Sequence, residues 1–197
     1  MQTLGISDSS ERSESRLKSL FWPSIQSGAD VDYLGAQGFW VCSLVAAISF
    51  LSALATGQYL LAAALLLFFH FGGVGVRERD LFAAAIVFGF YAFDTLISLT
   101  FMIVATPWGM AVLRVIFSAL LLSNLRATWI ASNWEPTSEK AALPPRFGDT
   151  FGDKFADLWP AWIWPKVRIV YYIFALLMVL FFALGIAGLV MRAARQF

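Results

Sequence analysis

Three ionisable side chains, Asp94, Arg114 and His70, stand inside long apolar stretches of the sequence. An ionised side chain at the centre of a bilayer costs about 2.5–3.5 kcal/mol on insertion scales, so each is a candidate functional residue if these stretches cross a membrane. Asp94 and Arg114 carry opposite charges, and we expect them to form an ion pair. The favoured interpretation is a pair that fixes the register of two helices. The alternative is an acid that serves in the movement of protons or cations.

His70 is the only histidine of the chain. By helical rise it falls at a depth similar to that of Asn124 and Arg126, which belong to another apolar stretch. A contact between His70 and Asn124 could form if the two helices are neighbours. We expect His70 to form a hydrogen bond to a neighbouring helix, the alternatives being a ligand-binding or catalytic role.

Other groups that could do chemistry are few. With one histidine and one cysteine, Cys42, the chain cannot form an internal disulfide, a metal site of several thiolates or histidines, or bis-histidine haem ligation by itself. The motifs HExxH, GxSxG, Walker A and CxxC do not occur in the sequence. The sequence therefore predicts no metal and no cofactor, and it favours a protein that is not an enzyme.

The composition shows what kind of element must position these residues. Of the 197 residues, 59% are hydrophobic and only 14% are charged, whereas soluble domains carry about 25% charged residues. The mean hydropathy of +0.72 also excludes soluble, disordered and coiled-coil classes. A net charge of +1 gives no basic field for nucleic acid. The sequence predicts an integral membrane protein whose first partner is the lipid bilayer.

Five stretches are long enough to cross a hydrocarbon core about 30 Å thick, which needs about 20 apolar helical residues. Short polar connections, several of them with Gly or Pro, separate the first four. The predicted fold is all-α, a bundle of five transmembrane helices. The spans cover about residues 34–54, 59–76, 81–104, 110–130 and 169–191.

Three segments lie outside these spans. Residues 1–33 read as a polar tail that ends in a surface-lying segment, and residues 192–197 as a short second tail. In the connection 131–168, apolar residues recur at helical spacing after residue 150, which predicts a short interfacial amphipathic helix before the last span. Its indole rings would lie at the headgroup level, where Trp side chains prefer to sit. They belong to Trp159, Trp162 and Trp164.

The distribution of Lys and Arg predicts the orientation, because cytoplasmic segments carry an excess of these residues. With the N-terminus in the cytoplasm, the opposite side has only Arg192 and Arg195. We therefore expect a cytoplasmic N-terminus and a C-terminus on the other side. The eleven residues on the cytoplasmic side are Arg12, Arg16, Lys18, Arg77, Arg79, Arg126, Lys140, Arg146, Lys154, Lys166 and Arg168.

Three functions remain open from the sequence. The first is a non-enzymatic accessory or scaffolding subunit that associates with other membrane subunits or with itself. The second is a small oligomeric transporter or channel that uses Asp94, Arg114 and His70. The third is a lipid-modifying membrane enzyme that uses His70, Asn124 and Arg126. Compact loops and the lack of a signal-peptide pattern favour a bacterial inner membrane.

Overall fold

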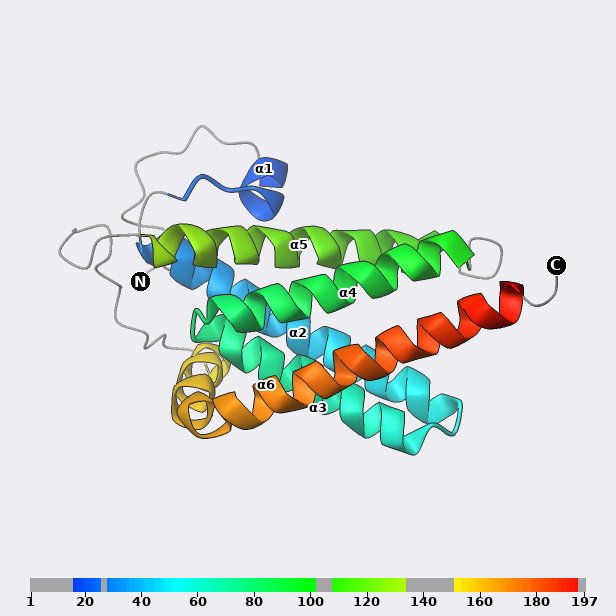
Figure 1. Ribbon diagram of the computed structural model, residues 1–197. Coiled ribbons are helices and arrows are strands. Elements are labelled where there is room, and N and C mark those ends of the chain that lie inside the picture. The colour runs from blue at the N-terminus through cyan, green and yellow to red at the C-terminus, as the bar shows by residue number, and fades with distance from the viewer. Residues whose placement is uncertain (1–15, 26–27, 102–107, 134–150, 195–197) are drawn as a thin grey trace.

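In the computed structural model, residues 16–25, 28–101, 108–133 and 151–194 are described, and within these ranges the regular structure is entirely helical. Five helices, α2 to α6, are long and apolar enough to cross a membrane. The protein is therefore an all-α integral membrane protein with a five-helix bundle, which confirms the predicted fold class. The helices are α1 (Arg16–Phe21), α2 (Gly28–Ala55), α3 (Tyr59–Arg77), α4 (Leu81–Phe101), α5 (Trp108–Ser132) and α6 (Phe151–Ala194) (Figure 1).

Helices α2 to α5 form a closed ring of four. Helices α2 and α3 pair as one hairpin and α4 and α5 as a second, and the hairpins join because α2 packs against α5 and α3 against α4. Helix α6 lies outside this ring and packs mainly against α3, while α1 lies on α5 (Figure 1). The short helix α1 falls in the segment that was predicted to lie on the surface.

Glycines let α2 and α3 approach closely. A Cβ atom added at Gly73 would lie 2.6 Å from Cβ of Cys42, and one added at Gly38 would lie 2.6 Å from Cγ1 of Val76. Both distances are too short for real carbon atoms. The packing of this hairpin therefore depends on small residues, as is common where membrane helices touch.

The turn between α3 and α4 is fixed by backbone and side-chain hydrogen bonds. Arg79 adopts a left-handed φ of 59°, and the N–H of Asp80 donates to the carbonyl of Gly75 at 2.9 Å. One carboxylate oxygen of Asp80 then accepts from the N–H groups of Phe82 at 3.0 Å and Ala83 at 3.1 Å. Asp80 thus caps the start of α4 and satisfies donors that have no partner within the helix.

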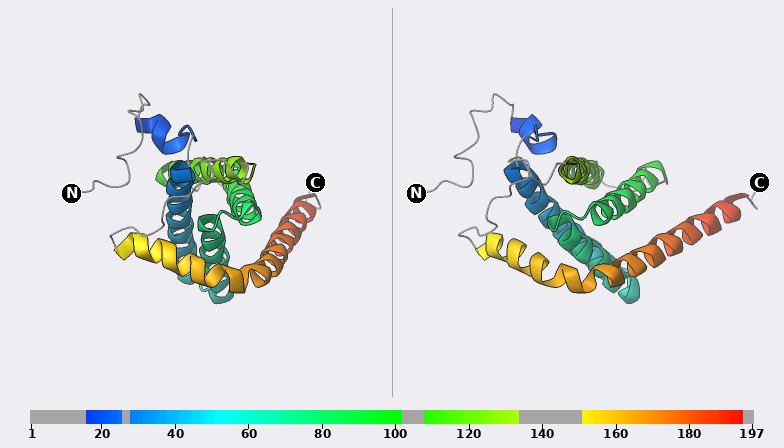
Figure 2. Two further views of the ribbon diagram at one scale, coloured as in Figure 1. Left: turned by 90° about the vertical axis from the view of Figure 1, so that its left-hand side faces the viewer. Right: turned by 60° about the vertical axis from the view of Figure 1, so that its left-hand side comes forward.

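Helix α6 corrects the prediction of a separate interfacial helix. Residues from Phe151 onward are helical as predicted, but they join the last span in one helix of 44 residues that contains Pro160 and Pro165. The helix changes direction between its first turns and its C-terminal half (Figure 2). Proline inside a helix removes a hydrogen bond and kinks it. The first turns of α6 contact α2 and α3 through Phe155 and Trp159.

Other predicted bounds need adjustment. Helix α2 begins at Gly28, earlier than the predicted residue 34, because Val31 and Leu34 in its first turns are buried in the bundle. The predicted ends of the tails, the end of the third span at 102–104 and the part of the connection at 134–150 lie outside the described residues.

Candidate functional site

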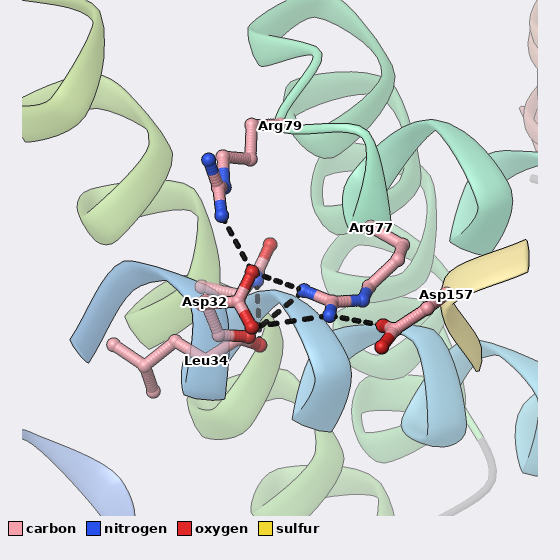
Figure 3. A network of polar contacts seen from close by, with 6 residues as sticks. Asp32, Leu34, Arg77, Arg79 and Asp157 are labelled. Carbon is pink, nitrogen blue, oxygen red and sulfur yellow. Dashed lines mark hydrogen bonds and ion pairs between the residues drawn. The ribbon is translucent and has the colours of Figure 1, made fainter. Parts of the chain in front are cut away.

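A network of buried charges joins α2, α3 and α6 at one end of the bundle. Its centre is Arg77, the last residue of α3, whose side chain is only 2% exposed. Its two terminal nitrogens donate to the two carboxylate oxygens of Asp32, at 2.8 Å and 3.1 Å, and one of them also donates to the backbone carbonyl of Asp32 at 3.0 Å. This two-pronged geometry is the strongest pairing that an arginine makes with a carboxylate (Figure 3).

Two further residues complete this network. Asp157, in the first turns of α6, accepts a hydrogen bond from Arg77 and is itself 7% exposed. Arg79, from the turn after α3, donates to Asp32 at 2.5 Å (Figure 3). The four side chains carry two positive and two negative charges, which compensate one another. Burial of such a group is tolerable only because each charge has partners.

A second cluster holds the middle of α6 to the α3–α4 turn. The hydroxyl of Tyr172 donates to a carboxylate oxygen of Asp80 at 2.6 Å, and Nε of Arg168 lies 3.0 Å from the other oxygen. Asp80 therefore caps α4 and binds α6 with the same side chain. Together, the two clusters attach α6 to the ring between Asp157 and Tyr172.

His70 takes part in the attachment of α6. Its Nε2 accepts a hydrogen bond from the indole nitrogen of Trp159 at 3.2 Å, and the ring of Phe39 lies beside it with a centroid separation of 6.3 Å. The predicted interhelix hydrogen bond thus exists, but the proposed partner Asn124 is wrong. Within the ring, α3 packs against α2 and α4. Its His70 side chain therefore contacts α6, and not Asn124 of α5.

Asn124 and Arg126 hold α5 to other segments. The buried amide of Asn124 donates to the carbonyl of Leu34 in α2 at 2.8 Å. Arg126 donates to the carbonyl of Pro23 at 3.0 Å, and its guanidinium carbon lies 4.6 Å from the ring centre of Trp22. Since these contacts involve different partners from those of His70, the structure does not unite the three residues in one site.

Asp94 and Arg114 are brought together across the α4–α5 hairpin. A terminal nitrogen of Arg114 donates to a carboxylate oxygen of Asp94 at 2.5 Å. The side chains are 28% exposed for Arg114 and 35% exposed for Asp94. Asp94 lies seven residues before the end of α4, roughly 10 Å by helical rise, whereas His70 lies seven residues before the end of α3. Because α3 and α4 run in opposite directions, His70 and the ion pair lie toward opposite ends of the bundle.

The three tryptophans of α6 have different surroundings. Trp162 is 57% exposed, with the Lys166 nitrogen 3.6 Å from its ring centre, and Trp159 is partly buried against His70. Trp164 is only 5% exposed and packs on Tyr171 in the core. Trp164 is thus covered by neighbouring helices, whereas Trp162 is open to its surroundings. The headgroup position of all three rings stays a prediction.

The buried network was missed from the sequence. Its four residues, Asp32, Arg77, Arg79 and Asp157, all lie outside the predicted spans. One signal in the sequence points to it. Asp157 stands among apolar residues at helical spacing, and a carboxylate that is buried with them needs a positively charged partner. Among the described residues, no group of three or more His, Cys, Asp or Glu side chains could hold a metal ion.

No family model matches the chain, and no curated protein or solved structure is significantly similar to it.

Proposed function

We propose that the protein is a non-enzymatic accessory or scaffolding subunit that associates along α6 with another membrane-spanning chain or with a second copy of itself. The observation that carries the proposal is the exposure of the last span. Only 11% of its apolar window is buried, against 28–44% for the other four spans. The C-terminal half of α6 leaves the ring of four in both further views (Figure 2).

A groove between α4 and α6 supports the same proposal. It has a volume of about 300 Å³ and lies between α4 and the C-terminal half of α6. Gly89 and Ala183 are small, so the backbone of an incoming transmembrane helix could approach closely. We call this the α4–α6 groove. It is lined by Ala85, Ile86, Gly89, Phe90, Phe93, Val179, Phe182 and Ala183.

The chemical groups of the described residues also support a subunit role. The carboxylates of Asp32, Asp80, Asp94 and Asp157 are all engaged by arginines. These pairs hold helices to one another. This use of the charged groups favours a structural role for them. The short connections between the spans are a separate point, and they support a bacterial inner membrane as the location.

The first test is the native mass of the full chain in a mild detergent, with co-purifying chains identified by mass spectrometry. We expect a stoichiometric second membrane chain or a homo-oligomer. Ala183→Trp, which fills the α4–α6 groove, should shift the protein toward the monomer. Leu60→Trp is the matched control, because Leu60 is 87% exposed on α3. A wild-type monomer without partners would contradict the proposal.

One observation favours a transporter or channel as a second candidate. The Asp94–Arg114 pair is partly open at a depth where charges avoid lipid. Its open side would then face water or a partner. Asp94→Asn should abolish ion or proton flux into liposomes in this case, whereas in the subunit case it should change only stability. Absence of flux in the wild-type protein would rule out this candidate.

A further inference from the structure

Arg126 differs from the other arginines of the helical bundle in its partners. Among the described arginines from Arg77 to Arg168, all except Arg126 pair with a carboxylate. Arg126 binds the carbonyl of Pro23 through one terminal nitrogen and lies on the Trp22 ring. No acidic side chain of the described residues compensates its positive charge.

A groove begins beside this residue, and the aliphatic stem of Arg126 forms part of its wall. It lies between the first turn of α4 and the last turns of α5 and has a volume of about 290 Å³. Its walls are aliphatic apart from Arg126 and the indole of Trp129, which is 59% exposed. We call it the Arg126 groove. It is lined by Leu81, Leu122, Leu125, Arg126 and Trp129.

The depth of the Arg126 groove matches a membrane interface. Arg126 lies six residues before the end of α5, roughly 9 Å by helical rise. An arginine at this depth reaches the headgroup region along its aliphatic stem. Exposed indoles such as that of Trp129 prefer the same region. Leu122, one turn deeper in α5, extends the apolar wall toward the hydrocarbon core.

We propose that the Arg126 groove binds one anionic phospholipid, with its phosphate on the Arg126 guanidinium and one acyl chain along Leu122 and Leu125. Guanidinium groups bind phosphate oxygens with paired N–H donors. Nε and the second terminal nitrogen of Arg126 have no acceptor among the described residues. The charge selects the anionic headgroup, and the aliphatic walls select a lipid over free phosphate.

The test uses the full chain purified in a mild detergent and exposed to phosphatidylglycerol, phosphatidylcholine or glycerol phosphate. Native mass spectrometry counts the bound molecules. We expect the wild-type protein to retain one phosphatidylglycerol in preference to phosphatidylcholine. Arg126→Gln should lower this occupancy at least fivefold, and Arg126→Lys should retain part of it. Arg192→Gln, at the far end of α6, should bind like the wild type.

A second variant keeps the test decisive if Arg126→Gln does not fold. Leu122→Trp fills the groove and leaves Arg126 in place, and Leu122 is 38% exposed. This variant should fold and lose the phosphatidylglycerol. Equal retention of both phospholipids, unchanged binding in Arg126→Gln, or displacement by glycerol phosphate would each overturn the proposal.

Discussion

At the scale of single residues, Arg77 is the centre of the buried ion-pair network. Its side chain is 2% exposed, and it is the common partner of Asp32 and Asp157. Burying a charge costs free energy because the charge leaves water, and the attraction of a buried partner offsets this cost. When the partner is removed, the cost stays and the attraction is lost. Any change at Arg77 therefore affects two carboxylates on two other helices.

We predict that Arg77→Gln destabilises the protein by about 3–5 kcal/mol, since the buried carboxylate of Asp157 loses its arginine and Asp32 keeps only Arg79. The measurement is unfolding of the purified protein in detergent, by heat or by a denaturing detergent. Arg192→Gln provides the control, because no polar contact of Arg192 is found among the described residues. Adding Asp157→Asn to Arg77→Gln should restore part of the loss. Equal stability of Arg77→Gln and wild type would contradict the network.

At the scale of helices, two glycines allow a matched comparison. Gly73 faces Cys42 across the α2–α3 contact, and a Cβ added there would clash at 2.6 Å. Gly185, in α6, has nothing within 4 Å of the same added atom. We predict that Gly73→Ala costs about 1–3 kcal/mol by overpacking, whereas Gly185→Ala is neutral or slightly stabilising. The same unfolding assay measures both, and a neutral Gly73→Ala would disprove the close approach.

The bend of α6 is attributed to Pro160 and Pro165. Replacing both with Ala restores the missing hydrogen-bond donors and should straighten the helix. Spin labels at Leu158 and Leu184, which are 53% and 69% exposed, would report the change. A straight helix separates these positions by roughly 39 Å along its axis. We expect the wild-type distance to be shorter and the double variant to approach this value. An unchanged distance would assign the bend to packing alone.

The sequence predicted the helices better than their contacts. Runs of about 20 apolar residues identify spans by themselves, and the Asp94–Arg114 pairing follows from the register of a short hairpin. The Trp159–His70 contact and the Asp32–Arg77–Asp157 network were not predicted, because they depend on where α6 crosses the ring. That crossing is set by tertiary packing and by the bend, which no local pattern specifies.

At the scale of the whole molecule, the charges define one end of the bundle. One end of the bundle holds four arginines, Arg77, Arg79, Arg126 and Arg168. It is the end at which α3 and α5 finish and the first part of α6 packs. By the excess of Lys and Arg, this end is predicted to be cytoplasmic. The opposite end is then left with few charges.

This orientation gives a direct prediction. In a bacterial host, alkaline phosphatase fused after residue 197 should be active, and a fluorescent protein fused there should be dark. Fusions placed in the 134–150 connection should give the reverse. The reversed pattern at both positions would show that the bundle has the opposite orientation in the membrane. Its internal packing would be the same.

The attachment of α6 has a consequence for how the chain is made. Ribosomes deliver Asp32 and Arg77 long before Asp157, so in the nascent four-helix ring Arg77 has its first carboxylate partner but not its second. The arrival of α6 supplies the second partner, Asp157. The last helix to be synthesised therefore completes the buried ion-pair network, and a chain that stalls before α6 leaves Arg77 with one carboxylate in place of two.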